Sequence, residues 1–398
     1  MAILDNIPSY SEAELLEIWK RKVQNIRLSW SEYEQGKIQP ESLPFKAIVE
    51  LTQNCNFKCV MCPQSWEKKF QKYDTNLNMP IETFKKLADQ LFPLATFVDL
   101  RGFGETTILS YWDEALEYLE KFPYVDWHLV TNLGVPKPQM WDRLMKMGFS
   151  LGFSCDGGTA ETFEKIRVRS KFSIIQKNLE AIKEARRKYG KGFIYFISTI
   201  QKDNIHEMKA IVELAHRYEV PEVQFKIVQG WHFQTDIEAY NKSAIQKFSL
   251  EALEAGKALG VSVIFNNHLF TEKINPELIR EVSRYVYPQN PNFGVLDEKY
   301  WNENNMQEID RAIIDTRRVS VHQKCFKPMS FIYVDYEAKV GTCNHMMYPD
   351  MLVMGNLKSQ DLGSIWNSPK YLDFRKQLLT RSPRDPRCQW CFKHRLDD

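Results

Sequence analysis

The chain has 398 residues, of which 43% are hydrophobic, and its 53 basic and 51 acidic residues leave a net charge of +2. This length predicts two to three domains with a sizeable core. The near-balance of charge gives no support for binding to nucleic acid or an anionic membrane, and no apolar run reaches the roughly 18–20 residues that span a bilayer.

Residues 1–44 are predicted to form an N-terminal helical extension. Its start, Met1 to Tyr10, lacks the basic and apolar regions of a secretory signal, so we expect a cytoplasmic protein. Ser11 and Glu14 have the spacing of a capping box. The apolar residues that follow at helical spacing indicate a packing face, with membrane or partner binding as the alternative; they are Leu15, Leu16, Trp19 and Val23.

Residues 45–235 alternate short strands with helices. The strands are expected over residues 46–51, 96–101, 127–131, 151–155, 193–199 and 222–228. Helices are expected between them, for example over residues 81–91, 112–121, 138–147 and 172–189. This order predicts an α/β fold with parallel strands, a closed or partial (β/α)6 barrel of the TIM type. The chemistry of such barrels gathers at the C-terminal ends of the strands.

A cysteine loop follows the first predicted strand. Cys55, Cys59 and Cys62 have the spacing C-x3-C-x2-C. A cubane iron–sulfur cluster normally takes four cysteines, so three would leave one iron open for chemistry. A zinc site built on the Cys59 and Cys62 pair is the alternative. Disulfides are disfavoured, because the chain has only eight cysteines and no secretory signal.

Weak candidates for catalysis follow other strands. The polar ones are Arg101, Lys226, Gln229 and His232. Cys155 lies between Ser154 and Asp156, and side chains alternate across a strand. We expect Cys155 to face the outer helices as a buried thiol; the alternative is a hydrogen-atom donor in the active site.

Residues 236–323 are predicted to bridge the barrel and the C-terminal module, or to form a lid. A helix is expected over residues 250–259 and a strand over 261–265, followed by an irregular stretch over 266–323. Aromatic residues that could line a lid are Trp231, Tyr285, Tyr287, Phe293, Tyr300 and Trp301.

Residues 324–398 form a second cysteine module. A hairpin predicted over residues 331–341 would bring Cys325 and Cys343 together, and Cys388 and Cys391 could complete a shell of four thiolates. The spacing alone fits a fully ligated iron–sulfur cluster and a structural zinc equally well.

The loop motif Cys55-Asn56-Phe57-Lys58-Cys59-Val60-Met61-Cys62-Pro63 resembles that of the radical S-adenosylmethionine (SAM) enzymes. The resemblance covers roughly residues 45–395. It implies a [4Fe–4S] cluster on Cys55, Cys59 and Cys62 whose open iron binds SAM. Met61 stands where the family often has an aromatic residue, and its backbone would lie near the adenine.

Other motifs agree in order and place. Gly104 and Glu105 match the end of the family's Gly-Gly-Glu turn, which holds the SAM amino group, although Phe103 and Thr106 depart from its pattern. Asn132 and Ser154 fall in segments similar to Thr-Asn-Gly and Ser-x-Asp-Gly. Arg167 occupies the place of a basic residue near the SAM carboxylate.

The C-terminal module resembles the SPASM and Twitch auxiliary-cluster domains. Full SPASM domains have about seven cysteines, whereas the four here can fully ligate one cluster. Their spacing is similar to that of 2-deoxy-scyllo-inosamine dehydrogenase. The resemblance therefore favours an auxiliary [4Fe–4S] cluster over zinc.

The resemblance implies reductive cleavage of SAM to a 5′-deoxyadenosyl radical that abstracts a substrate hydrogen. We expect oxidation of a small polar molecule such as a sugar or aminocyclitol, with the auxiliary cluster as electron acceptor and flavodoxin or ferredoxin as reductant. Alternatives are a sugar epimerase or an enzyme that modifies ribosomal peptides. The non-enzyme alternatives are an iron–sulfur electron carrier and a zinc-binding module.

Overall fold

The computed structural model describes residues 10–66, 77–228, 242–266, 270–283, 325–343 and 350–395. The chain divides into two compact units. The first consists of Met1–Asn54, Asp74–Trp127 and Asn290–Asp398, and the second of Cys55–Tyr73 and His128–Gln289. None of the helices in the described ranges is both long and apolar enough to cross a membrane. The domain boundaries expected from the sequence stay predictions.

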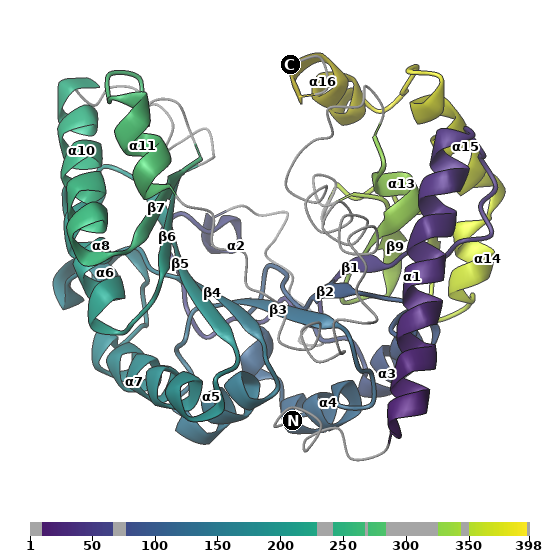
Figure 1. The fold of residues 1–398 in the computed structure, drawn as a ribbon, viewed down its shortest axis with the longest axis horizontal. Helices are drawn as coiled ribbons and strands as arrows, with labels where there is room; N and C mark the ends of the chain where they lie inside the picture. The colour runs from purple at the N-terminus through teal and green to yellow at the C-terminus, as the bar shows by residue number, and fades with distance from the viewer. Residues whose placement is uncertain are drawn as a thin grey trace. The chain divides into compact units, whose positions relative to one another are not determined.

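The second unit is built on parallel strands that pair in chain order. They are β3 (Asp126–Thr131, which begins at the end of the first unit), β4 (Ser150–Ser154), β5 (Phe193–Ile200), β6 (Glu222–Ile227) and β7 (Ser262–Phe265). The connecting helices are α5 (Pro138–Lys146), α6 (Ala160–Ile166), α7 (Phe172–Tyr189), α8 (Met208–Arg217) and α10 (Lys242–Leu259). In Figure 1 these helices lie along one side of β4 to β7. The predicted alternation of strands and helices is confirmed here.

Helix α7 shows how the sequence produces this layer. Its buried residues recur at helical spacing, from Ile175 through Leu179 to Ile182, so one face packs inward. The helix ends at Gly190, whose φ of 60° lies in the left-handed region that glycine adopts without a Cβ clash. Strand β5 begins three residues later, at Phe193.

The first unit centres on strand β1 (Lys46–Val49). Strand β1 has two parallel partners: β2 (Phe97–Asp99) pairs with one of its edges and β8 (Phe331–Val334) with the other. Strands β9 (Lys339–Gly341) and β10 (Gly355–Asn356) continue the sheet in antiparallel fashion. The predicted hairpin is therefore confirmed as β8 and β9. Its parallel pairing with β1, in the register that places Val334 beside Val49, was not expected.

Helix α1 (Glu12–Glu34) packs within this unit. The Glu14 backbone N–H donates to Ser11 Oγ at 3.3 Å, and the Ser11 backbone N–H donates to the Glu14 carboxylate at 2.7 Å, so the predicted capping box is present. Trp30 stacks on Phe326 with ring centroids 3.9 Å apart. Of the predicted packing face, Leu15, Trp19 and Val23 are buried, whereas Leu16 is half-buried.

The first unit contains further helices. They are α3 (Ile81–Leu91), α4 (Trp112–Leu119), α13 (Lys327–Ser330), α14 (Leu362–Trp366), α15 (Pro369–Leu379) and α16 (Pro386–Arg395), with the 3-10 turn η3 (Thr106–Ile108). The guanidinium of Arg375 in α15 is buried between Trp366 and Tyr371, 4.3 Å from each ring centroid, and donates to the Trp366 carbonyl at 2.7 Å. This stacking joins α14 to α15 beside the cysteine module.

One expectation for the bridging region needs correction. The stretch 266–323 was expected to be irregular, yet Pro276–Val282 forms helix α11, which Asn275 caps by accepting from the Glu277 N–H at 2.9 Å. An asparagine before proline at the first helical position is a start signal that the sequence reading overlooked. The proposed lid aromatics Tyr285, Tyr287, Phe293, Tyr300 and Trp301 lie outside the described residues.

Candidate functional site

The backbone of the cysteine loop is fixed within the second unit. The Lys58 N–H donates to the Val168 carbonyl at 2.9 Å, and the Val60 N–H donates to the Ile166 carbonyl at 3.0 Å. The Cys62 N–H donates to the Cys59 carbonyl at 3.1 Å, which closes a turn between two of the cysteines. The loop is thus held from the segment after α6, and Cys59 is buried while Cys55 and Cys62 are half-buried.

Asn132, which directly follows β3, contacts the first part of the loop. Its Nδ2 donates to Asn56 Oδ1 at 2.8 Å and lies 3.7 Å from Cys55 Sγ, while its Oδ1 accepts from the Gly134 N–H at 2.7 Å. A Cβ on Gly134 would lie 2.5 Å from the Phe57 ring, so only glycine lets the turn approach the loop this closely. The Thr-Asn-Leu-Gly segment therefore supports the cysteine loop directly.

Arg167 and Asp156 contact the middle of the loop. Arg167 Nη1 lies 3.6 Å from Cys59 Sγ, and Arg167 Nη2 lies 2.6 Å from Asp156 Oδ2. Asp156 is fully buried and also accepts from the Thr199 N–H at 2.6 Å. Burial opposes the charge of Arg167, but Asp156 and Cys59 outweigh that cost and raise the pKa of the guanidinium. A permanent positive charge therefore stands beside a predicted cluster ligand.

The remaining predicted residues of this unit have distinct surroundings. Met61 and Ser154 are half-buried, in the loop and at the end of β4. Cys155 is fully buried, and its thiol lies 3.5 Å from the Gly157 carbonyl. Burial raises the pKa of Cys155, with the Asp156 charge acting in the same direction. This environment agrees with the interpretation of Cys155 as a buried thiol.

Gly104 and Glu105 lie in the first unit, in the segment after β2. The Glu105 N–H donates to the Asn54 carbonyl at 2.8 Å, one residue before the cysteine loop. A Cβ on Gly104 would lie 2.4 Å from the Thr52 carbonyl and 2.5 Å from the Asn54 carbonyl, which explains the glycine. The carboxylate of Glu105 is buried and accepts from the Thr107 hydroxyl at 2.6 Å.

Glu50 is a buried acid that the sequence analysis missed. It directly follows β1 and accepts from the Phe103 N–H at 2.7 Å and from the Tyr333 hydroxyl of β8 at 2.9 Å. Burial raises its pKa to about 7, in spite of these hydrogen bonds. A single acid in the apolar run of residues 47–51 was the available signal. Glu50 connects β8 to the turn that carries Gly104.

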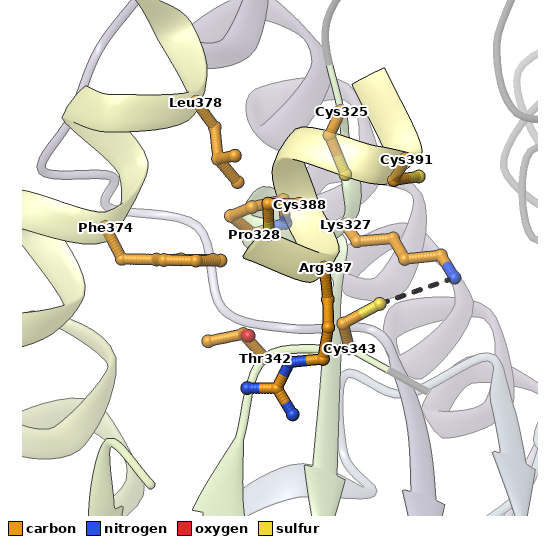
Figure 2. Close-up of a pocket in the computed structure, with 10 residues that line it drawn as sticks. All are labelled: Cys325, Lys327, Pro328, Thr342, Cys343, Phe374, Leu378, Arg387, Cys388 and Cys391. Atoms are coloured by element: carbon orange, nitrogen blue, oxygen red, sulfur yellow. Dashed lines mark hydrogen bonds between the residues drawn. The ribbon is translucent and has the colours of Figure 1, made fainter. Parts of the chain in front are cut away.

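The four C-terminal cysteines line one pocket of the first unit. Figure 2 shows Cys325 before α13, Cys343 after β9, and Cys388 and Cys391 on α16. The apolar wall is formed by Pro328, Phe374 and Leu378. Two cations, Lys327 and Arg387, also line the pocket. The hairpin and helix α16 thus bring four cysteines, from positions 325 to 391, to the lining of one pocket, and the predicted shell of four thiolates stays a prediction.

Burial opposes the ionisation of two of these thiols. It raises the pKa of Cys325 and of Cys388 to about 12 each, and neighbouring cysteines add to the effect. Soft metals and iron–sulfur clusters bind thiolates, so loading this pocket must release protons. In the ranges that the structure covers, no three His, Cys, Asp or Glu side chains converge closely enough to hold a metal ion.

Two of the weak catalytic candidates, Arg101 and Lys226, lie in the described ranges. Arg101 Nε lies 2.9 Å from Asp99 Oδ2, and Lys226 is half-buried in β6. Gln229, His232 and the aromatic Trp231 lie outside the described residues. Their roles stay predictions.

Family models match two parts of the chain. The model described as the radical SAM superfamily matches residues 49–215, and SPASM, described as an iron–sulfur cluster-binding domain, matches residues 325–392. No curated protein sequence matches the chain.

Solved structures share the fold at low sequence identity. Streptococcus suis SuiB bound to S-adenosylmethionine has a TM-score of 0.58 and 15% identity, over 88% of this chain and 72% of SuiB. Native anSMEcpe with bound AdoMet has a TM-score of 0.55 and 14% identity, over 89% of this chain and 88% of that chain. The predicted fold class is confirmed: an α/β fold with parallel strands, the partial barrel of these proteins and a C-terminal iron–sulfur module.

Proposed function

Because this chain belongs to the radical SAM superfamily, in the branch that carries a SPASM domain, we propose that it oxidises a substrate by abstracting a hydrogen atom. The predicted cofactors, SAM and [4Fe–4S] clusters, follow from the two matched domains. When bound, they supply a 5′-deoxyadenosyl radical and an acceptor for one electron. The chain is thereby an enzyme, and the reaction and substrate are our proposal.

The donor sets fit these groups. Three thiols lie on one loop, which leaves a cubane cluster one iron open for the amino and carboxylate groups of SAM. Asn132 and Arg167 contact this loop at Cys55 and Cys59 and would hold it in place. We assign Glu105 to the SAM ammonium, Arg167 to the region of its carboxylate and the Met61 backbone to the adenine.

The observation that carries the proposal is the closed set of four cysteines around one pocket. A complete thiolate shell leaves no iron open to substrate, so this set suits electron transfer rather than binding. Cys55, Cys59 and Cys62 would be the ligands of the SAM-binding cluster. Cys325, Cys343, Cys388 and Cys391 would be those of the auxiliary cluster.

The eighth cysteine favours oxidation over epimerisation. An epimerase needs a hydrogen-atom donor, commonly a thiol, on the far face of the substrate. Cys155 is the one cysteine outside both sets, and it is fully buried beside the Gly157 carbonyl. We therefore propose that the substrate radical loses an electron and a proton to give a carbonyl compound.

The substrate we propose is a small polar molecule such as a sugar or aminocyclitol. Helix α1 packs on Phe326 and Met329 within the first unit, which supports a structural role for it rather than that of a separate peptide-recognition domain. The second candidate is a peptide, because the structurally similar SuiB has been solved bound to the precursor peptide SuiA. The reductant would be a flavodoxin or ferredoxin, in the cytoplasm, where thiols remain reduced.

The test is anaerobic reconstitution with iron and sulfide, followed by SAM and dithionite. We expect about eight irons per chain, as two cubane clusters require, and formation of 5′-deoxyadenosine. Absence of 5′-deoxyadenosine from the iron-loaded protein would end the proposal. Deuterated sugars, aminocyclitols and peptides then identify the substrate, because only the true substrate transfers deuterium into 5′-deoxyadenosine.

A further inference from the structure

A lysine side chain extends to one of the four auxiliary cysteines. Lys327 is the first residue of α13, two positions after Cys325, and its Nζ lies 3.9 Å from Cys343 Sγ. Figure 2 shows the side chain running along the pocket to this sulfur. The contact therefore joins the entry of α13 to the end of β9.

The second cation of the pocket, Arg387, forms an ion pair with Asp385. Arg387 Nη2 lies 2.6 Å from Asp385 Oδ2, and Arg387 Nε donates to Asp385 Oδ1 at 2.9 Å. Its guanidinium charge is therefore largely compensated by a carboxylate two positions away in sequence. The Lys327 ammonium group contacts a cysteine sulfur and lies 5.8 Å from the centroid of the Phe331 ring.

The charge of the protein around an iron–sulfur cluster sets how readily the cluster takes an electron. Reduction adds one negative charge, and both a nearby cation and a hydrogen bond to a ligand sulfur stabilise the reduced form. In a partly buried pocket this stabilisation is screened less than at an exposed surface. An ammonium group at Cys343 therefore favours electron acceptance.

We propose that Lys327 is a positioning residue that raises the reduction potential of the auxiliary cluster through its contact with Cys343. The inference rests on the proposed function, in which the substrate radical is oxidised. In that step the carbon radical gives one electron to the oxidised cluster, the hydroxyl proton leaves to a base, and a carbonyl compound forms. A higher potential moves this step towards the oxidised product.

The experiment compares Lys327→Met and Lys327→Gln, which lose the charge, with Lys327→Arg, which keeps it. Lys339→Met is the matched control, because Lys339 lies in the same module and its Nζ pairs with Glu337 at 2.6 Å. The midpoint potential of the auxiliary cluster is measured in the anaerobic, iron-loaded full chain by EPR-monitored redox titration. Recording spectra with and without SAM distinguishes it from the loop cluster.

We expect Lys327→Met and Lys327→Gln to make reduction of the auxiliary cluster about tenfold less favourable, which is about 59 mV for a one-electron couple. Lys327→Arg and Lys339→Met should keep the wild-type potential. An unchanged potential in both neutral variants, or an equal fall in Lys339→Met, would overturn the role of Lys327.

Failure of the inference is distinct from failure of the proposed function. If the wild-type chain holds no auxiliary iron or forms no 5′-deoxyadenosine, the proposed function is wrong. If the wild-type chain holds auxiliary iron and forms 5′-deoxyadenosine, but the midpoint potential is the same in the Lys327 variants, only the inference is wrong. If the Lys327→Met variant binds less iron than the wild type, the role of Lys327 is judged from the midpoint potential of the Lys327→Gln variant at full iron content.

Discussion

The loop cysteines and the pocket cysteines differ in how the chain brings them together. Three thiols of the loop lie between Cys55 and Cys62, so their spacing is set by local backbone, fixed by two hydrogen bonds to the segment at Ile166 and Val168. The pocket cysteines come from the entry of α13, the end of β9 and helix α16. The first set is a property of one loop, whereas the second requires a folded module.

Their surroundings differ as well. Cys55 and Cys59 contact an amide and a guanidinium that other elements of the second unit supply, Asn132 and Arg167. In the pocket, the thiols are surrounded by one another, an apolar wall and Lys327. Under the proposed function, the loop would leave one position of its cluster open to a ligand, and the pocket would enclose its cluster.

The largest expected effect comes from the loop. Cys59→Ala should abolish 5′-deoxyadenosine formation, because the cluster that cleaves SAM loses a ligand, and should leave about four irons per chain in the pocket set. Iron analysis and product chromatography measure both. Cys155→Ala is the matched control and should retain both clusters and activity; its inactivity with full iron would instead support a hydrogen-atom donor.

The next effect separates the two sets. Cys388→Ala removes one thiol of the closed shell, so SAM cleavage should continue while oxidised product falls by at least about tenfold relative to 5′-deoxyadenosine, the equivalent of about 1.4 kcal/mol. The ratio of product to 5′-deoxyadenosine is the measurement. An unchanged ratio would mean that the pocket set plays no part in substrate oxidation.

The two sets also differ in how far the sequence predicts them. The loop could be recognised because its spacing is local, and the family resemblance pointed to Asn132 and Arg167, which contact it in the structure. The pocket was predicted through the hairpin that brings Cys325 and Cys343 together. The contact of Lys327 with Cys343 could not be predicted, because it depends on where a four-carbon side chain extends across the fold. Glu50 was missed because its partners, Phe103 and Tyr333, lie 53 and 283 residues away.

A third prediction concerns Glu50, which follows strand β1, the strand that pairs with β8 of the C-terminal module. The pKa of Glu50 is raised from 4.5 to about 7, so its folded state binds a proton more tightly than its unfolded state. The contribution of Glu50 to the free energy of unfolding is therefore greatest below about pH 4.5. It falls by about 3 kcal/mol as the pH rises to about 7.

The Glu50→Gln variant has no titratable group at this position, so its free energy of unfolding should lack the pH dependence that Glu50 causes. The difference in unfolding free energy between the two proteins, measured between about pH 4.5 and pH 8, should change by that amount in favour of the variant at higher pH. Asp335, whose own burial raises its pKa to about 6, remains in both proteins, and its charge is one of the causes of the raised Glu50 pKa. A constant difference across the range would contradict a buried, protonatable Glu50.

The smallest expected effect concerns the close approach of the Gly104 backbone to the backbone of Thr52 and Asn54, just before the cysteine loop. Gly104→Ala places a Cβ within about 2.5 Å of the Thr52 and Asn54 carbonyls, and such overpacking costs typically about 1–3 kcal/mol. We expect a lower unfolding temperature and weaker SAM binding by equilibrium dialysis. Gly363→Ala is the control, because no atom lies within 4 Å of its Cβ position; a loss as large there would exclude a specific clash at Gly104.

The parallel pairing of β8 with β1 limits how this protein can be divided or recombined. Removing the chain from residue 325 onward would leave β1 with an unpaired edge and the Glu50 carboxylate without the Tyr333 hydroxyl. The C-terminal module is therefore not an exchangeable cassette. A chimera with another auxiliary domain must donate a strand in the register of Phe331–Val334 and a hydroxyl for Glu50, whatever cluster that domain carries.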